Sequence, residues 1–176
     1  MLRGAKVGIR PVRSADLPFL YEKMNDLESV GDYLPSVFKS YPELVSEYEQ
    51  SGFLSESLSR LLVVDETGDV IGLTWFFTSV PYFDALEVGY RIFDVSHRRK
   101  GYASEALGLL CKYIFEGFGV NRIEIRVATE NTSSKKVAIK CGFELEGTHR
   151  QAAFSKGSLH DMYSFALLRD DWLISR

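Results

Sequence analysis

The sequence predicts a single mixed α/β domain spanning residues 1–176. Apolar residues alternate with polar ones in Ile123–Val127, which is the period of a half-buried strand. In Ala103–Phe118 they recur every three or four positions, which is the period of one helix face. Segments of the two kinds alternate along the chain, as in mixed α/β domains. A length of 176 residues with 45% hydrophobic composition suits one packed core.

The N-terminal third predicts one strand and two helices. Val7–Arg10 is a strand closed by Pro11. A helix follows over Ser14–Leu27, with Ser14 as the N-cap and Pro18 in the first turn. The pattern weakens in Ser29–Ser59, where we expect one helix near Tyr41–Gly52 with irregular flanks.

The middle of the chain predicts three strands and the longest helix. Arg60–Val64 and Val70–Thr78 form a hairpin around a turn at residues 65–69. A strand follows over Glu87–Val95. The helix Ala103–Phe118 comes next and ends at the glycines Gly117 and Gly119.

The C-terminal third predicts a strand, a short helix and a closing hairpin. The strand is Ile123–Val127, and the helix Ser133–Lys140 stops at Gly142. The hairpin pairs Phe143–Phe154 with Asp161–Leu168 around the turn 155–158. The expected order is therefore β-α-α-β-β-β-α-β-α-β-β.

Composition excludes several classes of function. The net charge of −3 disfavours a general electrostatic grip on nucleic acid. No apolar run approaches the ~20 residues that cross a bilayer, and no secretory signal opens the sequence, so we expect a cytoplasmic protein without a membrane partner. Two cysteines, Cys111 and Cys141, suit buried thiols in a reducing compartment. Neither the cysteines nor the three scattered histidines have metal-ligand spacing, so no metal is expected.

One segment carries the features of an anion site. A basic run, His97–Lys100, lies between a strand and the long helix and is followed by Gly101 and Ala103. A helix N-terminus presents free backbone N–H groups and the positive end of its dipole, and small residues let an anion approach them. The segment is neither a Walker loop nor a dinucleotide fingerprint. A solvated turn is the alternative that composition leaves open.

The same segment resembles a known family. Arg98-Arg99-Lys100-Gly101-Tyr102-Ala103 matches the Arg/Gln-x-x-Gly-x-Gly/Ala signature of the GNAT acetyltransferases. Further matches stand around it in the order of that family's branch of ribosomal-protein N-terminal acetyltransferases; they are Ile9–Asp16, Glu87–Tyr90, Asn131–Ser134, Lys140–Gly147, Asp161 and Asp171-Trp172. The resemblance covers nearly the whole chain and is weakest over Ser29–Ser59.

The resemblance implies a mixed, mostly antiparallel sheet of six to seven strands, with splayed central strands and about four flanking helices. It implies acetyl-CoA as cosubstrate, bound in the splay. Backbone amides of Phe93 and Val95 would contact the pantetheine arm and thioester, and Asn131 and Ser134 would reach the cofactor from the other side. The pyrophosphate would be wrapped by the turn made of Arg98, Arg99, Lys100, Gly101, Tyr102, Ala103 and Ser104.

Direct acetyl transfer to an amine requires a base and a proton donor for the leaving thiolate. Glu87 is the first candidate base, with a surface carboxylate as the alternative. Many family members carry a tyrosine acid at the position that Ala138 holds here. The serine matching Ser134 can take that role in the branch, although a residue of a helix first turn also explains it. Tyr90 and Tyr102 are alternative donors, and the thiolate could also leave unprotonated.

The resemblance implies an N-acetyltransferase whose leading acceptor is the α-amine of a protein or peptide. A small amine, such as an antibiotic, a polyamine or an aminoacyl derivative, is the alternative acceptor. An acyl-CoA-binding sensor without turnover is the alternative class, because Ala138 removes the usual acid. Acidic residues in Ser29–Ser59 and Ser79–Leu86 could draw a cationic amine. Either a monomer or a homodimer fits the sequence.

Overall fold

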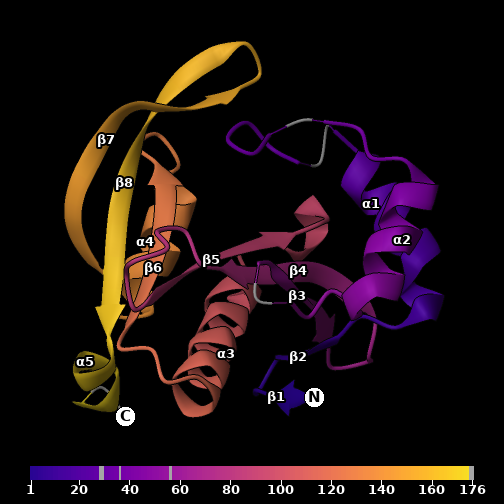
Figure 1. Ribbon diagram of the computed structural model, residues 1–176, viewed down its shortest axis with the longest axis horizontal. Helices are drawn as coiled ribbons and strands as arrows, with labels where there is room; N and C mark the ends of the chain where they lie inside the picture. The colour runs from indigo at the N-terminus through magenta and orange to yellow at the C-terminus, as the bar shows by residue number, and fades with distance from the viewer. Residues whose placement is uncertain (28–29, 36, 56, 175–176) are drawn as a thin grey trace.

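Alternation of side chains along the central strands places helices on both faces of one sheet. In strand β3 (Ser59–Asp65), Leu61 and Val63 pack toward helix α3 (Tyr102–Gly117). Leu62 packs on the opposite face, toward α1 (Leu17–Asn25) and α2 (Tyr41–Ser51). The computed structural model shown in Figure 1 describes residues 1–27, 30–35, 37–55 and 57–174. Parts of the segment Ser29–Ser59, namely residues 29, 36 and 56, lie outside the described residues.

Eight strands form one sheet within the described part of the chain, in the order β1-β2-β3-β4-β5-β6-β8-β7. Besides β3 they are β1 (Leu2–Arg3), β2 (Val7–Pro11), β4 (Val70–Phe77), β5 (Ala85–Ile92), β6 (Arg122–Ala128), β7 (Glu144–Ser155) and β8 (Ser158–Leu168). All neighbouring pairs are antiparallel except β5 and β6. The mixed, mostly antiparallel sheet is confirmed, with one strand more than expected.

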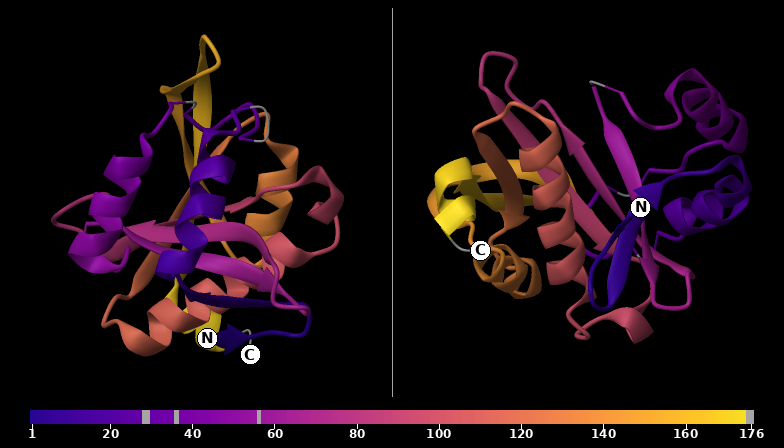
Figure 2. Two further views of the ribbon diagram at one scale, coloured as in Figure 1. Left: turned by 90° about the vertical axis from the view of Figure 1, so that its right-hand side faces the viewer. Right: turned by 90° about the horizontal axis from the view of Figure 1, so that it is seen from below.

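In the part of the chain that the structure describes, five α-helices flank the sheet: α1 (Leu17–Asn25), α2 (Tyr41–Ser51), α3 (Tyr102–Gly117), α4 (Thr132–Lys140) and α5 (Arg169–Ile174). Figure 1 shows α1 and α2 together on one side of the molecule and the hairpin β7–β8 on the other. Figure 2 shows the same halves from two further directions, with α3 running beneath the strands. No helix among the described residues is long and apolar enough to span a bilayer.

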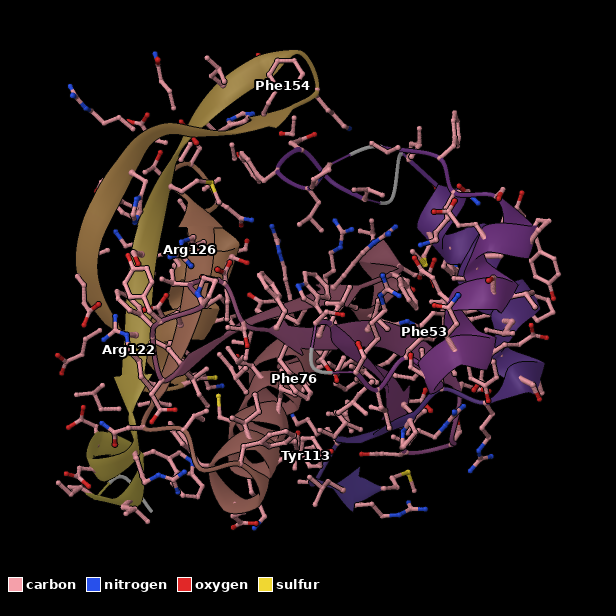
Figure 3. All side chains as sticks on the ribbon, viewed as in Figure 1. Phe53, Phe76, Tyr113, Arg122, Arg126 and Phe154 are labelled. Atoms are coloured by element: carbon pink, nitrogen blue, oxygen red, sulfur yellow. The ribbon has the colours of Figure 1, made fainter. Side chains whose placement is uncertain are left out.

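Two apolar clusters hold these layers together. The larger lies between α3 and the sheet and includes Leu107, Leu110 and Ile114, all fully buried. Figure 3 shows Phe76 of β4 beside Tyr113 of α3 in this layer, and their ring centroids are 6.1 Å apart. The smaller cluster joins α1 and α2 to the other face of β3 and β4.

Several boundaries differ from the sequence prediction for local reasons. Ser14 opens a short 3-10 helix (Ser14–Asp16), and Asp16, not Ser14, holds the N-cap position of α1. The cause is Arg10, whose guanidinium binds both Asp16 oxygens at 2.7 and 2.8 Å. Strand β5 ends at Ile92 instead of Val95, because Asp94 turns away to pair with Lys23 of α1 at 2.8 Å.

The parallel pair β5–β6 is the feature that positions the candidate site. Only three registered pairs join the two strands, from Ala85 and Arg122 to Glu87 and Glu124. Beyond Glu87 and Glu124 the strands diverge, although each continues for at least four residues. The expected splay of the central strands is therefore present.

Candidate active site

The splay divides the candidate residues between two faces of the sheet. On β5, Leu86, Val88 and Tyr90 face α3, so Glu87 points to the opposite face. On β6, Ile123, Ile125 and Val127 face α3, while Glu124 and Arg126 share the face of Glu87. Glu87 and Tyr90 are three residues apart, about 10 Å along a strand.

On the α3 side, Tyr90 and Ser134 meet across the splay. The Tyr90 hydroxyl lies 2.8 Å from Oγ of Ser134, which belongs to the first turn of α4. Burial raises the pKa of Tyr90 to about 12, so its phenol keeps its proton at neutral pH. The structure thus brings together two of the candidate proton donors, Tyr90 and Ser134. The ring of Tyr102 lies 6.3 Å from that of His97.

Asn131 has a local structural role. It is the N-cap of α4, where its Oδ1 accepts the Ser134 N–H at 3.0 Å. This bond fixes the start of α4 and with it the backbone position of Ser134. The Phe93 N–H, which was expected to face the cofactor, donates to the carbonyl of Ile71 at 3.0 Å. Val95 is largely exposed and accepts the Arg98 N–H through its carbonyl.

The basic turn has the backbone geometry of an anion site. Arg99 and Gly101 both adopt positive φ, at 61° and 86°, and Gly101 precedes the first residue of α3. Positive φ at these two positions folds the chain into a tight turn before α3, whose first N–H groups lack helical partners and can bind an anion. Glycine adopts this conformation without strain, whereas arginine does so at a cost.

The N-terminal segment supports this turn. Lys6 donates from Nζ to the Lys100 carbonyl at 3.1 Å and from its backbone N–H to Glu105 at 2.9 Å. A groove of about 330 Å³ begins beside the turn and follows α3. It is lined by Lys6, Gly101, Ser104, Glu105, Gly108, Lys140 and Cys141. No local pattern pointed to Lys6 and Lys140, because they come from distant parts of the chain.

On the opposite face, Glu87 is ion-paired. Its Oε2 accepts a hydrogen bond from Nη1 of Arg126. Burial raises the pKa of Glu87 above the ordinary range, and the Arg126 guanidinium opposes that rise. Figure 3 shows Arg126 on β6, the strand next to that of Glu87. Arg126 was not among the predicted site residues, because its only signal in the sequence is its place in the alternation of the strand.

Some of the acids expected to attract a cationic amine are paired with cations. Glu47 of α2 forms ion pairs with Lys39 and Arg60. Asp32 pairs with Lys156 at 3.2 Å, and its carbonyl accepts the Ser155 hydroxyl at 2.5 Å. The last two contacts join the loop after α1 to the hairpin β7–β8, which approach one another in Figure 1. Within the described ranges, no three His, Cys, Asp or Glu side chains gather to hold a metal ion.

Comparison with known proteins agrees with this geometry. Residues 6–144 match the family model described as an acetyltransferase (GNAT) domain. An uncharacterized N-acetyltransferase p20 of Bacillus licheniformis is 38% identical over 111 residues, which are 63% of this chain and 62% of that protein. The ribosomal-protein-serine acetyltransferase of Escherichia coli is 29% identical over 64% of this chain and 62% of its own length. The chain thus spans less than two thirds of these relatives.

A solved structure matches over nearly the whole chain. Spermidine N-acetyltransferase from Vibrio cholerae, crystallised in complex with CoA and spermine, superposes with a TM-score of 0.84. The match covers 97% of this chain and 99% of that one at 22% identity, and it shows a shared fold. With a family model covering most of its length, this chain belongs to the GNAT acetyltransferase family.

Proposed function

We propose that the protein is an acetyl-CoA-dependent N-acetyltransferase that transfers acetyl directly to a primary amine. The leading acceptor is the N-terminal α-amine of a protein or peptide. The observation that carries the proposal is the divergence of β5 and β6 after Glu87 and Glu124. It separates a carboxylate on one face from the Tyr90–Ser134 hydroxyl pair on the other, with a basic turn at its end.

The residues present fit acetyl-CoA. The first N–H groups of α3, from Tyr102, Ala103 and Ser104, start a helix whose N-cap has positive φ, so they are suited to bind phosphate oxygens. Arg98, Arg99 and Lys100 add positive charge to the turn, and the groove along α3 gives room for the nucleotide part. The bound thioester supplies an activated acetyl group.

Glu87 is the proposed proton acceptor. The reaction forms a bond between the amine nitrogen and the acetyl carbon and breaks the bond from that carbon to sulfur. The amine proton passes to the Glu87 carboxylate, directly or through a water molecule. A free α-amine has a pKa near ~8, so little activation is required. Burial helps, because a carboxylate with a raised pKa is a stronger base.

Ser134 is the proposed donor to the departing thiolate. Ala138 occupies the position of the usual tyrosine, so that group is absent at this point of α4. The Ser134 hydroxyl is oriented by Tyr90 at 2.8 Å and by the capped start of its helix. When Ser134 gives its proton to sulfur, the protonated phenol of Tyr90 can stabilise the serine oxygen through the same hydrogen bond.

The choice of acceptor rests on charge. A polyamine carries several positive charges, yet Asp32 and Glu47 already have cationic partners in this protein. An α-amine brings one positive charge at most and needs a single proton acceptor, which is the proposed role of the Glu87 carboxylate beside its ion pair with Arg126. The E. coli relative, named as acting on a serine of ribosomal protein, supports the same choice. A small amine remains the competing acceptor because the Vibrio structure contains spermine.

Calorimetric titration with acetyl-CoA, free CoA and ATP tests the cofactor first. Saturable binding of the two CoA species without ATP binding is expected. Thiol release is then measured with peptides that carry a free or a blocked N-terminus, beside spermidine. Activity on the free peptide alone supports the proposal. Activity on spermidine alone would replace the acceptor, and no binding of acetyl-CoA would overturn the function.

A further inference from the structure

Five charged side chains form a ladder on the face of Glu87. They alternate in sign across β5, β6 and β7 in the order Glu87, Arg126, Glu124, Arg122 and Glu146. The ladder begins where β5 and β6 part. Two of its rungs, Glu87 and Glu124, are direct partners in the strand register.

The carboxylates of Glu87 and Glu124 lie directly opposite each other on neighbouring strands and repel each other. Both are shielded from water. The Glu124 side chain is 4% exposed and that of Glu87 is 16% exposed. Like charges directly opposite one another destabilise a sheet unless a cation separates them. Arg126 supplies that cation, because it lies two residues beyond Glu124 and therefore on the same face of β6.

The Arg126 guanidinium connects the two carboxylates. Its Nη1 donates to Oε2 of Glu87 and its Nη2 lies 3.3 Å from Oε2 of Glu124. The other Glu124 oxygen, Oε1, accepts Nε of Arg122 at 2.6 Å. Arg122 is held in turn by Glu146 of β7 through both of its terminal nitrogens. Both oxygens of Glu124 are thus occupied, which makes Glu124 an anchor for Arg126.

We propose that Arg126 is the positioning residue of the reaction, held by Glu124 and Arg122 so that it fixes the Glu87 carboxylate at the mouth of the splay and sets its affinity for a proton. This inference rests on the proposed role of Glu87. Arg126 touches Glu87 but lies on the face opposite the Tyr90–Ser134 pair. It therefore acts on the amine side of the reaction and not on the leaving thiolate.

The groups around Glu87 decide the direction of the effect. Arg126 and Glu124 face it from β6, Ser79 faces it from the β4–β5 loop, and its register partner on β4 is the uncharged Phe77. Burial and Glu124 both favour the protonated form, whereas Arg126 and Ser79 favour the carboxylate. Without Arg126, the effects of burial and of Glu124 are less strongly opposed, so Glu87 should bind its proton more tightly.

The test compares R126Q, R126K and E124Q with R10Q. The control variant, R10Q, removes another arginine that is shielded from water. Arg10 binds both carboxylate oxygens of Asp16 and lies outside the ladder. In R126Q, we expect the acidic limb of the kcat/KM profile to move up by about one unit or more. Acetyl-CoA affinity should stay within about twofold. R126K retains the positive charge but lacks the planar guanidinium that binds two carboxylates at once. We therefore expect a lower kcat and a smaller shift of the acidic limb. E124Q should lower kcat because Arg126 loses its anchor.

A second readout does not depend on turnover. The Glu87 carboxyl carbon is followed by NMR through a pH titration, with E87Q to assign the signal. An upward shift of its midpoint in R126Q but not in R10Q supports the positioning role. Equal midpoints in wild type and R126Q would overturn it, even in an active enzyme. Failure of wild type to bind acetyl-CoA would overturn the proposed function and leave this titration informative. If R126Q does not fold, R126K gives the same comparison, and an unchanged midpoint together with unchanged kcat refutes the inference.

Discussion

The hydroxyl pair across the splay gives the sharpest prediction. Replacing Tyr90 by Phe or Ser134 by Ala removes one partner of a 2.8 Å hydrogen bond and leaves the other partner without it in a partly buried place. Each single change should cost about 1–3 kcal/mol of unfolding free energy. Because either change already breaks the bond, the double variant should cost less than the sum, by about 1 kcal/mol.

Urea unfolding of the four proteins at neutral pH measures that difference. For a chain of this length, 1 kcal/mol corresponds to a change of about 2–4 °C in Tm, so thermal unfolding gives an independent value. Additive losses, within about 0.3–0.5 kcal/mol, would show that the two hydroxyls do not interact.

Activity separates the roles of the same two residues. If Ser134 protonates the thiolate, S134A should lower kcat by about 10²-fold or more, with acetyl-CoA affinity nearly unchanged. Y90F should have a smaller effect, because Tyr90 acts through Ser134. Thiol release under saturating acetyl-CoA is the assay. An S134A enzyme with wild-type kcat would refute the assignment of Ser134 as the acid.

Three further predictions concern the turn, the sheet and alkaline stability. R99A should weaken acetyl-CoA binding by about 1.5–3 kcal/mol, or about 10- to 150-fold in Kd by calorimetry. The control K112A, on the exposed flank of α3, should bind acetyl-CoA as wild type does. Equal affinities of R99A and wild type would remove Arg99 from the site. G89A should lower the free energy of unfolding, measured in urea, by about 1–3 kcal/mol, because a Cβ at Gly89 would lie 2.3 Å from the Trp75 ring. An unchanged free energy of unfolding would mean that the indole moves freely. The pKa of Cys141 is raised by burial to about 11, so its thiol ionises more readily in the unfolded chain and stability should fall by about 2 kcal/mol as pH rises from 9 to 11. C141A should flatten that decline in urea titrations at several pH values, and an unchanged slope would contradict the assignment.

Local periodicity was sufficient for most elements. The alternation in Ile123–Val127 is confirmed by β6, where Ile123, Ile125 and Val127 all lie in the larger cluster. The prediction of Ser14 as the N-cap of α1 was wrong, because Arg10 of β2 binds the Asp16 carboxylate and Asp16 holds that position. The two residues of β1 are too few for any period, and α5 is a short helix secured by Trp172 against Phe115. Neither had a signal in the sequence strong enough to predict it.

Those parts of the site that lie next to one another in the chain could be predicted from the sequence. The basic turn and the start of α3 are contiguous, so their shared geometry follows from the sequence. The splay could be expected only through family resemblance, because β6 follows β5 after a long helix and pairs with it over three residues. Arg126 is 39 positions from Glu87, and no spacing rule joins residues on two parallel strands. Pairings of this kind depend on tertiary register.

The short pairing of β5 with β6 also bears on how the molecule folds. Three registered pairs are a slender backbone connection between two groups of strands. The stronger connection is α3, because Val88 of β5 and Ile125 of β6 both belong to the apolar cluster beneath that helix. Neither group of strands can bury its inner face without α3, and the helix has no complete apolar partner until both are in place. We therefore expect the two groups to unfold together, so that amide protons in β3 and β8 exchange with the same opening free energy.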